Sequence, residues 1–438
     1  MDAVDEPIKI EQFLQFQKYQ QVFHFLHFQF VRNADGRLIN KSELVFRAGF
    51  LLDVWFFGIN LFDILRSIQL GETSHQNLPV LSISIYFTIR GIMMFIKRHD
   101  IVDFLNVLDR EFPKDLVSQR VLNVPQVFER YHRRHGYVGL YANYALPGFC
   151  LTPVVTYILT YEDRNAPILL DHQLLGGWLP YDLRQNHLVY PLVWLYDVYC
   201  MLVGVTFFTS FDTLFNTMQA QVIMYLDCFC RQLEALNAVD SYQAMDERQF
   251  HEHICGLIRR HQQLNLICDK FNDIFKLAIL ITDLVGATSI CFHLYLITEN
   301  QDPLMIIKYI LPTLALVVFT FEICLRGTQL EEASSRLNEA LYNQNWYMGS
   351  KMYRKLILIW IKYAQCTRKL TAYGLVEINM KHFSDVSDRY SLHFVHLSIS
   401  LFFRLCSWRT DYSLFSSPDN KSKAWLGHSS VSHFSPNL

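Results

Sequence analysis

The chain has 438 residues, of which 51% are hydrophobic, 15% are aromatic and only 18% are charged. Soluble domains carry about 25% charged residues, so this composition excludes an ordinary soluble enzyme or scaffold. The net charge of −2 provides no basic surface and excludes nucleic acid as a partner. The apolar residues gather in runs of about 20, the length that crosses a bilayer, and they predict an all-α membrane protein.

Residues 1–43 are predicted to form a cytosolic or interfacial helix. Six apolar residues recur three or four positions apart, which makes a largely aromatic stripe; they are Phe13, Phe16, Tyr19, Phe23, Leu26 and Phe30. The chain begins Met-Asp-Ala-Val-Asp-Glu, which is acidic and lacks the basic start of a signal peptide. We therefore expect no cleaved signal peptide and expect the first membrane span to direct insertion.

Six strong hydrophobic spans follow, and each is long enough to cross the hydrocarbon core as a helix. The spans are residues 44–65, 78–95, 136–160, 188–210, 274–298 and 304–325. The connections between them alternate between two sets. The first set comprises residues 71–77, 161–187 and 299–303. The second set comprises residues 97–135, 212–273 and 326–383.

Positively charged residues indicate the orientation of the spans. The N-terminal segment and the second set of connections carry 27 Lys and Arg residues, whereas the first set carries only Arg164 and Arg184. Because Lys and Arg stay on the cytosolic side, the N-terminus is predicted to be cytosolic. This topology is the reverse of a G-protein-coupled receptor; moreover, no D-R-Y motif closes the third span and no N-P-x-x-Y motif occurs near the end of the chain.

Six charged residues of the predicted spans are expected at membrane depth, where a side chain facing lipid costs roughly 2.5–3.5 kcal/mol at the bilayer centre. They are Asp53, Asp63, Arg90, Asp197, Asp283 and Glu322. We expect these side chains to face the interior of the bundle or to lie near an interface, and some of them to line a polar cavity. A pair of Arg90 with Asp53 or with Asp197 is one such arrangement, and the sequence leaves both open.

The sequence contains no catalytic, metal-binding or cofactor-binding pattern. Residues 251–253 read His-Glu-His and Cys255 follows, but this is not the H-E-x-x-H spacing of a zinc site, and we interpret it as a solvated helix face. No G-x-S-x-G, kinase or nucleotide motif occurs. The 10 cysteines suggest no disulfide framework. No pair of Gly- or Pro-broken spans suggests a transporter. We therefore predict a protein that is not an enzyme and has neither cofactor nor metal.

The last long connection carries the most specific pattern in the chain. Leu330, Leu337 and Leu341 recur at helical spacing, and residues 351–363 form a second, basic and amphipathic helix. The distinctive positions are Gly327, the Ser334-Ser335 pair, Leu337, Ala340-Leu341-Tyr342, Trp346, the basic and aliphatic run to Gln365, and the step Leu370-Thr371-Ala372. Together they resemble the C-terminal signature of insect odorant receptors.

This resemblance implies a seven-helix bundle with a cytosolic N-terminus in the plasma membrane of sensory neurons. It implies that the chain binds a small volatile odorant and forms an odorant-gated cation channel as a hetero-tetramer with a shared co-receptor. It also implies that residues 327–375 form a layer of subunit contacts, with Tyr342 and Trp346 as contact residues. A gustatory receptor of the same superfamily is an alternative, although its short T-Y…Q-F signature is absent.

A pocket for the volatile ligand is implied in the outer halves of the second to fourth spans. Small apolar ligands suit a closed site lined by aromatic side chains with a few hydroxyls. The candidate ligand-binding residues are Ser84, Tyr86, Phe87, Tyr144, Pro147, Phe149, Tyr157, Trp194 and Tyr199. Each of them also suits a core position or the aromatic belt at the membrane interface.

The resemblance stops at about Val386. Residues 391–403 supply only 13 residues before Arg404, so the seventh helix is atypical and residues 386–408 form a marginal span. An altered reading frame or a retained intron produces such an abrupt change, and a non-conducting splice or truncated variant is therefore a second alternative. The other interpretation of these residues is a seventh helix that is divergent in sequence but functional.

The predicted organisation has five parts. They are a cytosolic or interfacial segment at 1–43, a six-span bundle with the odorant pocket at 44–325, a cytosolic helical assembly segment at 326–385, the marginal span at 386–408 and a polar disordered tail at 409–438.

Overall fold

The computed structural model consists almost entirely of helices. The residues that it describes are 6–14, 30–40, 43–69, 78–160, 168, 173–175, 186–235, 247–299, 303–386 and 388. The predicted disordered tail, and all of the predicted marginal span except Val386 and Asp388, therefore lie outside the described residues.

In chain order the elements are α1 (Ile10–Leu14), β1 (Phe30–Arg32), β2 (Leu38–Asn40), α2 (Glu43–Gln69), α3 (Leu78–Ile96), α4 (Arg98–Glu111), α5 (Leu116–Val121), α6 (Val124–Thr160), α8 (Tyr190–Ala235), α10 (Glu247–Glu299), α11 (Pro303–Tyr342), η5 (Trp346–Met348), α12 (Lys351–Ala364), β3 (Thr371–Ala372) and β4 (Val376–Glu377). The six predicted spans fall in α2, α3, α6, α8, α10 and α11. Within the described residues, Tyr190–Glu234, Glu247–Glu299 and Tyr309–Met348 are long and apolar enough to cross a membrane. The predicted all-α class is confirmed.

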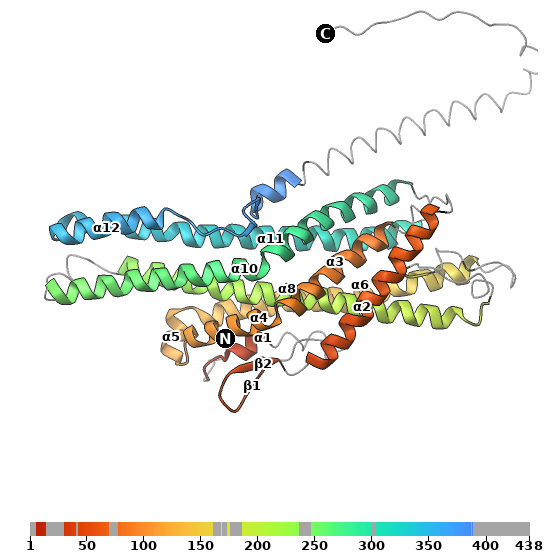
Figure 1. Ribbon diagram of the computed structural model, residues 1–438, viewed down its shortest axis with the longest axis horizontal. Helices are drawn as coiled ribbons and strands as arrows, with labels where there is room; N and C mark the ends of the chain where they lie inside the picture. The colour runs from red at the N-terminus through yellow and green to blue at the C-terminus, as the bar shows by residue number, and fades with distance from the viewer. Residues whose placement is uncertain are drawn as a thin grey trace, which may run out of the picture. The chain divides into compact units, whose positions relative to one another are not determined.

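The centre of the bundle is formed by α3, α8, α10 and α11 (Figure 1). Helix α3 packs on α10 and α8, while α11 packs on α8 and α10. Phe211 and Phe215 of α8 meet Phe271 and Phe275 of α10, with ring centroids 5.2 to 5.6 Å apart across the contact. Helix α2 lies against α3 and α8, and α6 lies against α8 and α11.

Helices α8 and α10 are much longer than a membrane span. They have 46 and 53 residues, which is roughly 70 and 80 Å of helix against a hydrocarbon core of about 30 Å. The sequence analysis treated residues 212–273 as a connection, but α8 continues to Ala235 and α10 already begins at Glu247. The parts of α8 and α10 beyond the predicted spans are helical because each buries one face against the rest of the chain. Tyr225 on α8 is 3% exposed, and Ile254 on α10 is 1% exposed.

The N-terminal segment packs on α5 and α6. Gln119 holds both backbone groups of Ile8, because its Oε1 accepts from Ile8 N at 2.9 Å and its Nε2 donates to Ile8 O at 2.7 Å. Phe13 is 3% exposed, and its ring centroid lies 5.1 Å from that of Phe128. The N-terminal segment and residues 97–135 therefore lie on the same side of the bundle.

The predicted aromatic helix of this segment is present only in part. Helix α1 ends at Leu14, and Phe30 opens β1, which pairs with β2 across a turn in which Gly36 adopts a φ of 74°. The Asn106 side chain fastens this hairpin to α4, because it bonds Leu38 N and Leu38 O at 2.9 and 3.2 Å. Phe30 thus lies in a strand, since the turn and the contacts with α4 favour a hairpin. The rest of the stripe lies outside the described residues and comprises Phe16, Tyr19, Phe23 and Leu26.

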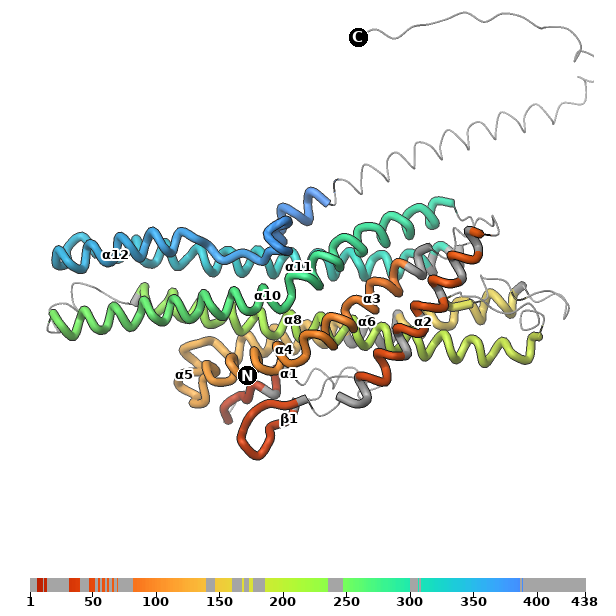
Figure 2. The backbone as a smooth tube through the Cα atoms, viewed as in Figure 1, coloured from red at the N-terminus to blue at the C-terminus, as the bar shows by residue number. Residues whose placement is uncertain are grey.

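Helix α12, the β3–β4 hairpin and residues 378–386 form a unit that we call the C-terminal layer (Figure 2). It packs on α10 and α11. Ser350 caps α12, since its Oγ accepts from Tyr353 N at 3.3 Å. Thr371 N donates to Asn272 Oδ1 at 2.9 Å, which ties β3 to α10. Helix α11 runs without a break to Tyr342, so the predicted boundary after residue 325 falls inside one helix.

A buried histidine joins α10 to the C-terminal layer, outside the predicted spans. His261 is 2% exposed, and Trp360 Nε1 donates to His261 Nδ1 at 2.8 Å. An indole N–H can only donate, so Nδ1 is unprotonated and the neutral ring carries its proton on Nε2. Burial, and after it the charge of Arg368, lowers the pKa of His261 from 6.5 to about 4.

Acidification is therefore expected to weaken the C-terminal layer. Because the pKa of His261 is lower in the folded chain, the unfolded chain binds more protons between pH 6.5 and about 4. The free energy of unfolding has its full value above pH 6.5 and falls towards pH 4, by up to about 3 kcal/mol. Thermal melting of the purified chain across this range measures the effect. We expect His261→Gln to weaken the dependence of the melting temperature on pH. The control His253→Gln, at an exposed histidine, should leave this dependence unchanged. If the melting temperature of His261→Gln still falls with pH as in the unchanged chain, the prediction is wrong.

Candidate ligand site

Three of the predicted ligand residues lie together on α3, where it meets α8. Tyr86 and Ser84 are 1% and 5% exposed, and Phe87 is half-buried. The rings of Tyr86 and Phe87 each lie 5.8 Å from Phe208 of α8. The Phe208 ring in turn lies 4.4 Å from Phe319 of α11 in an edge-to-face contact. We call these five residues the middle cluster; its aromatic side chains come from three helices, and Ser84 and Tyr86 contribute buried hydroxyls.

Arg90 follows Tyr86 by one helical turn and is fully buried. Its Nη2 donates to Tyr86 Oη at 2.6 Å. The guanidinium carbon lies 4.3, 4.4 and 5.0 Å from the ring centroids of Tyr86, Phe208 and Phe211. Such cation–π contacts offset part of the desolvation of a buried charge. The sequence suggested a carboxylate partner, Asp53 or Asp197; the structure provides a phenol and aromatic faces, and the Asp53 side chain lies outside the described residues.

A second group of predicted residues gathers at the junction of α6, α8 and the loop between them. Tyr157 stacks on Tyr190 with ring centroids 4.1 Å apart, and its hydroxyl lies 2.6 Å from His187 Nδ1. Trp194 Nε1 donates to the backbone oxygen of Cys150 at 2.9 Å. We call Tyr157, His187, Tyr190 and Trp194 the outer cluster, and it joins the two helices at their loop ends.

Asp197 fastens part of the loop beside the outer cluster. Its Oδ2 accepts from Leu174 N and Leu175 N at 3.2 and 3.3 Å, and the residue is 4% exposed. Leu174 is 1% exposed and packs with Cys150 and the half-buried Phe149. The buried carboxylate is therefore hydrogen-bonded by backbone amides of the loop, and it does not form the expected ion pair with Arg90.

Two of the remaining predicted ligand residues are exposed and belong to neither cluster. Pro147 is exposed on α6, and Tyr199 is 44% exposed on α8. The side chain of Tyr144 lies outside the described residues. Phe208 and Phe319 were not expected in the middle cluster, because spacing along one helix does not show which residue of another helix it will meet.

An arginine and two carboxylates join α6, α8 and α11 inside the bundle. Arg134 forms ion pairs with both Asp212 and Glu322. The Asp212 side chain is 1% exposed, and Asn216 Nδ2 donates to its Oδ1 at 3.1 Å. Arg326 lies 3.8 Å from Glu322, so two cations face two anions. The sequence analysis had placed Arg134 and Asp212 in connections, and only Glu322 was expected in the interior.

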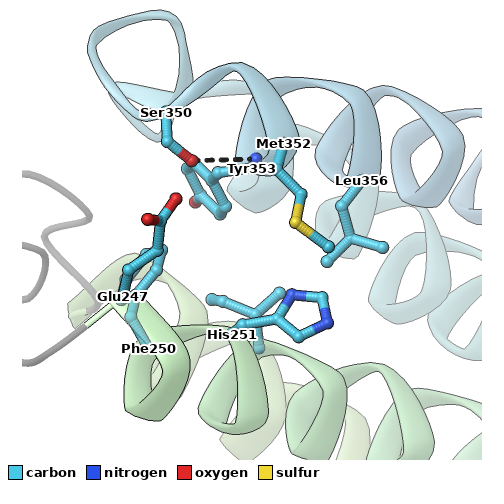
Figure 3. Close-up of a pocket in the computed structure, with 8 residues that line it drawn as sticks. Glu247, Phe250, His251, Ser350, Met352, Tyr353 and Leu356 are labelled. Carbon is cyan, nitrogen blue, oxygen red and sulfur yellow. Dashed lines mark hydrogen bonds between the residues drawn. The ribbon is translucent and has the colours of Figure 1, made fainter.

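The His-Glu-His run lies away from both clusters. Within the described residues, no group of three or more His, Cys, Asp or Glu side chains is arranged to hold a metal ion. His251 Nε2 lies 3.6 Å from Cys255 Sγ on α10. Figure 3 shows the hollow beside it, between the first turns of α10 and α12. Its lining contains no predicted ligand residue and comprises Glu247, Phe250, His251, Ile254, Ser350, Met352, Tyr353 and Leu356.

Comparison with known protein families shows which family the chain belongs to. The family model described as 7tm Odorant receptor matches residues 71–388, which is well over half of the chain. The chain belongs to this odorant receptor family. Its homologues are receptors rather than enzymes, so the expected class of protein is confirmed.

Individual relatives agree with the family match. Odorant receptor 88a of Drosophila melanogaster is 45% identical over 385 residues, which cover 87% of this chain and 95% of that relative. Odorant receptor 67c of the same species is 24% identical, over 68% of this chain and 74% of the relative. The solved insect olfactory receptor OR5 from Machilis hrabei, in complex with eugenol, superposes with a TM-score of 0.72 at 14% identity, covering 89% of this chain and 98% of that one. The odorant receptor chain thus has the insect olfactory receptor fold.

Proposed function

We propose that this odorant receptor binds a small volatile ligand inside the bundle and, with a shared co-receptor, forms an odorant-gated cation channel. The middle cluster carries the proposal, because it brings aromatic rings from three helices together and includes the buried residues Ser84 and Tyr86. Such a site suits a small, largely apolar molecule with one polar group. The eugenol in the similar receptor from Machilis hrabei supports binding of a small organic molecule.

In this proposal the middle cluster contacts the ligand, and Phe149 with the outer cluster closes the outer end of the site. Pro147 and Tyr199 are exposed and take no part in it. Patch-clamp recording of cells that express the chain with and without the co-receptor, over an odorant panel, tests the function. We expect odorant-gated current only when both subunits are present. Failure of the purified chain to bind any odorant overturns the proposal.

Subunit contact through residues 327–375 leads to a specific prediction. Tyr342 is 65% exposed at the end of α11, whereas Trp346 is partly buried against the core. Tyr342→Ala is therefore expected to reduce co-assembly with the co-receptor severalfold without unfolding the chain. Trp346→Ala removes internal packing as well and should lower both assembly and stability.

Co-purification of the two subunits, normalised to the surface level of each variant, measures the effect of Tyr342→Ala. Tyr137→Ala is the matched control, since Tyr137 is 67% exposed on α6. Normal assembly of Tyr342→Ala together with a changed odorant ranking would place this residue in the ligand site instead.

A cytosolic N-terminus and a plasma-membrane location form part of the proposal. Asn40 and Asn420 both lie in N-x-S glycosylation sequons. Asn40 ends β2, in the hairpin that packs on α4, so we expect it to remain unmodified in cells. Glycosidase treatment followed by mass spectrometry measures occupancy, and a glycan on Asn40 would reverse the proposed topology. Asn420 lies outside the described residues, and a glycan there would support a seventh span.

A second candidate function is a non-conducting form of such a receptor. The family match ends at residue 388, although the chain continues to residue 438. The marginal residues 386–408 occupy the place of the helix that lines the ion pathway in this family. In this form the chain binds odorant but conducts poorly, even with the co-receptor. Robust odorant-gated current excludes it, and transcript sequencing across the codons of Asp385 and Val386 tests the origin of the change.

A further inference from the structure

Arg90 has hydrogen-bond donors for which the described part of the chain provides no acceptor. Its Nη2 bonds Tyr86 Oη at 2.6 Å, but its Nε and Nη1 reach no acceptor among the described residues. The residue is 0% exposed. Unpaired donors on a buried charged group are more destabilising than those on a neutral group. An acceptor from outside the chain would remove this deficit.

The side of α10 that faces α3 also carries buried polar groups without a hydrogen-bond partner among the described residues. A Cβ on Gly286 would lie 3.4 Å from the Tyr86 ring, so Gly286 marks the part of α10 that faces α3. Thr282 and Ser289 share this face at helical spacing. They are 6% and 0% exposed, and within the described residues their hydroxyls have no hydrogen-bond partner. Unpaired polar groups from two helices thus border one buried region beside the middle cluster.

The geometry around Arg90 restricts the kind of molecule that can complete this region. The rings of Tyr86, Phe208 and Phe211 lie over the guanidinium at 4.3 to 5.0 Å, so an acceptor approaches in the guanidinium plane, where the N–H groups point. A carbonyl oxygen accepts a bond from either Nε or Nη1, which point to different edges of the guanidinium. An ionised carboxylate is disfavoured, because bringing an ion through an aromatic and aliphatic interior costs far more than bringing a neutral carbonyl.

We propose that Arg90 recognises the odorant and that this site selects neutral molecules with a carbonyl oxygen on an apolar body. The proposal rests on the proposed odorant-binding function and names the chemical class that the same site takes. Thr282 and Ser289 provide further polar groups on the face of α10 that packs against α3. A ligand of equal length without the oxygen loses a hydrogen bond to a charged donor, which corresponds to roughly tenfold to hundredfold in affinity.

Binding measurements on the purified full-length chain in nanodiscs test this selectivity without requiring a conducting channel. Octanal, octane and octanoate are the probes, because they share chain length and differ in the head group. We expect octanal to bind at least roughly tenfold more tightly than octane. Arg90→Gln should lower octanal affinity to that of octane and leave octane binding unchanged.

The matched control is Arg98→Gln. The Arg98 guanidinium also lies over a phenylalanine ring, 4.6 Å from the centroid of Phe95, but at the start of α4 and outside the middle cluster. We expect this variant to keep the preference for octanal. Arg90→Lys, which keeps a charged donor, should retain part of it, and melting curves recorded for each variant separate a binding defect from unfolding.

Each outcome bears on a different part of the proposal. Equal binding of octanal and octane by the unchanged chain overturns the proposed selectivity but leaves the odorant-binding function intact, and this comparison needs no variant. Tighter binding of octanoate overturns the neutral class. A folded Arg90→Gln that still prefers octanal removes Arg90 from the site. Failure of every volatile in a broad panel to bind contradicts the odorant-binding function itself.

Discussion

Replacing Gly327 with alanine is expected to displace the C-terminal layer from α11. A Cβ at this position would lie 1.8 Å from the backbone oxygen of Ile378. A backbone oxygen cannot move aside by changing rotamer, so the chain around Ile378 must shift, together with the bond from Ile378 N to Leu370 O at 2.9 Å. Overpacking typically costs 1–3 kcal/mol, and we expect about 3 kcal/mol or more here.

Gly256→Ala is the matched control for this substitution. Gly256 also lies inside a long helix, but a Cβ there meets nothing within 4 Å. Alanine at that position should stabilise α10 by roughly 0.5–1 kcal/mol, because glycine is unfavourable in a helix interior. Thermal melting and the rate of trypsin cleavage at Lys369 and Lys381 measure both variants. Unchanged melting and cleavage in Gly327→Ala would show that the close approach to Ile378 does not matter.

Arg134→Met is expected to destabilise the bundle by about 3–5 kcal/mol. Methionine has a similar length but no charge, so Asp212 and Glu322 lose their shared cation. The Asp212 side chain is 1% exposed and its charge would remain buried without a cation partner. We expect little protein at the cell surface and a strongly lowered melting temperature.

The neighbouring Arg133 provides the control. It pairs with Glu129 at 3.0 Å, but the two side chains are 66% and 65% exposed, and an exposed pair contributes at most about 0.5 kcal/mol on a helix. Arg133→Met should therefore melt close to the unchanged chain. Adding Asp212→Asn and Glu322→Gln to Arg134→Met should restore much of the stability, since the buried anions are then gone. If this triple variant is no more stable than Arg134→Met alone, the loss comes from packing rather than from charge.

The presence of glycine at position 327 of the sequence signature has a physical explanation in the structure. Gly327 was singled out by its place in a family pattern, and nothing in the sequence indicated what a side chain there would meet. The structure brings the backbone of Ile378 against it from more than 50 residues later in the chain. Tyr342 and Trp346 belong to the same pattern, yet only Tyr342 is largely exposed. The surroundings of each residue in the folded chain, and not its spacing along the sequence, distinguish Tyr342 from Trp346.

The candidate site could be predicted only in part. Ser84, Tyr86 and Phe87 were chosen for residue type and depth; Ser84 and Tyr86 are buried, and the rings of Tyr86 and Phe87 contact each other. Pro147 and Tyr199 were chosen on the same grounds and are exposed. Residue type and depth in a span do not determine which face of the helix points inward, because each face can meet lipid, loop or helix.

The helical class follows from the residues alone, because hydrophobicity and helical periodicity are local properties of the chain, whereas the spaced signature within residues 327–385 indicated the family. The sequence also showed that charged residues such as Arg90 and Glu322 had to find partners, since lipid provides none. The folded chain supplies these partners: a phenol and aromatic faces for Arg90, and an arginine from α6 for Glu322. The reason is physical, since the free energy of a buried charge depends on the groups within a few ångströms of it, and those groups come from helices far apart in the sequence.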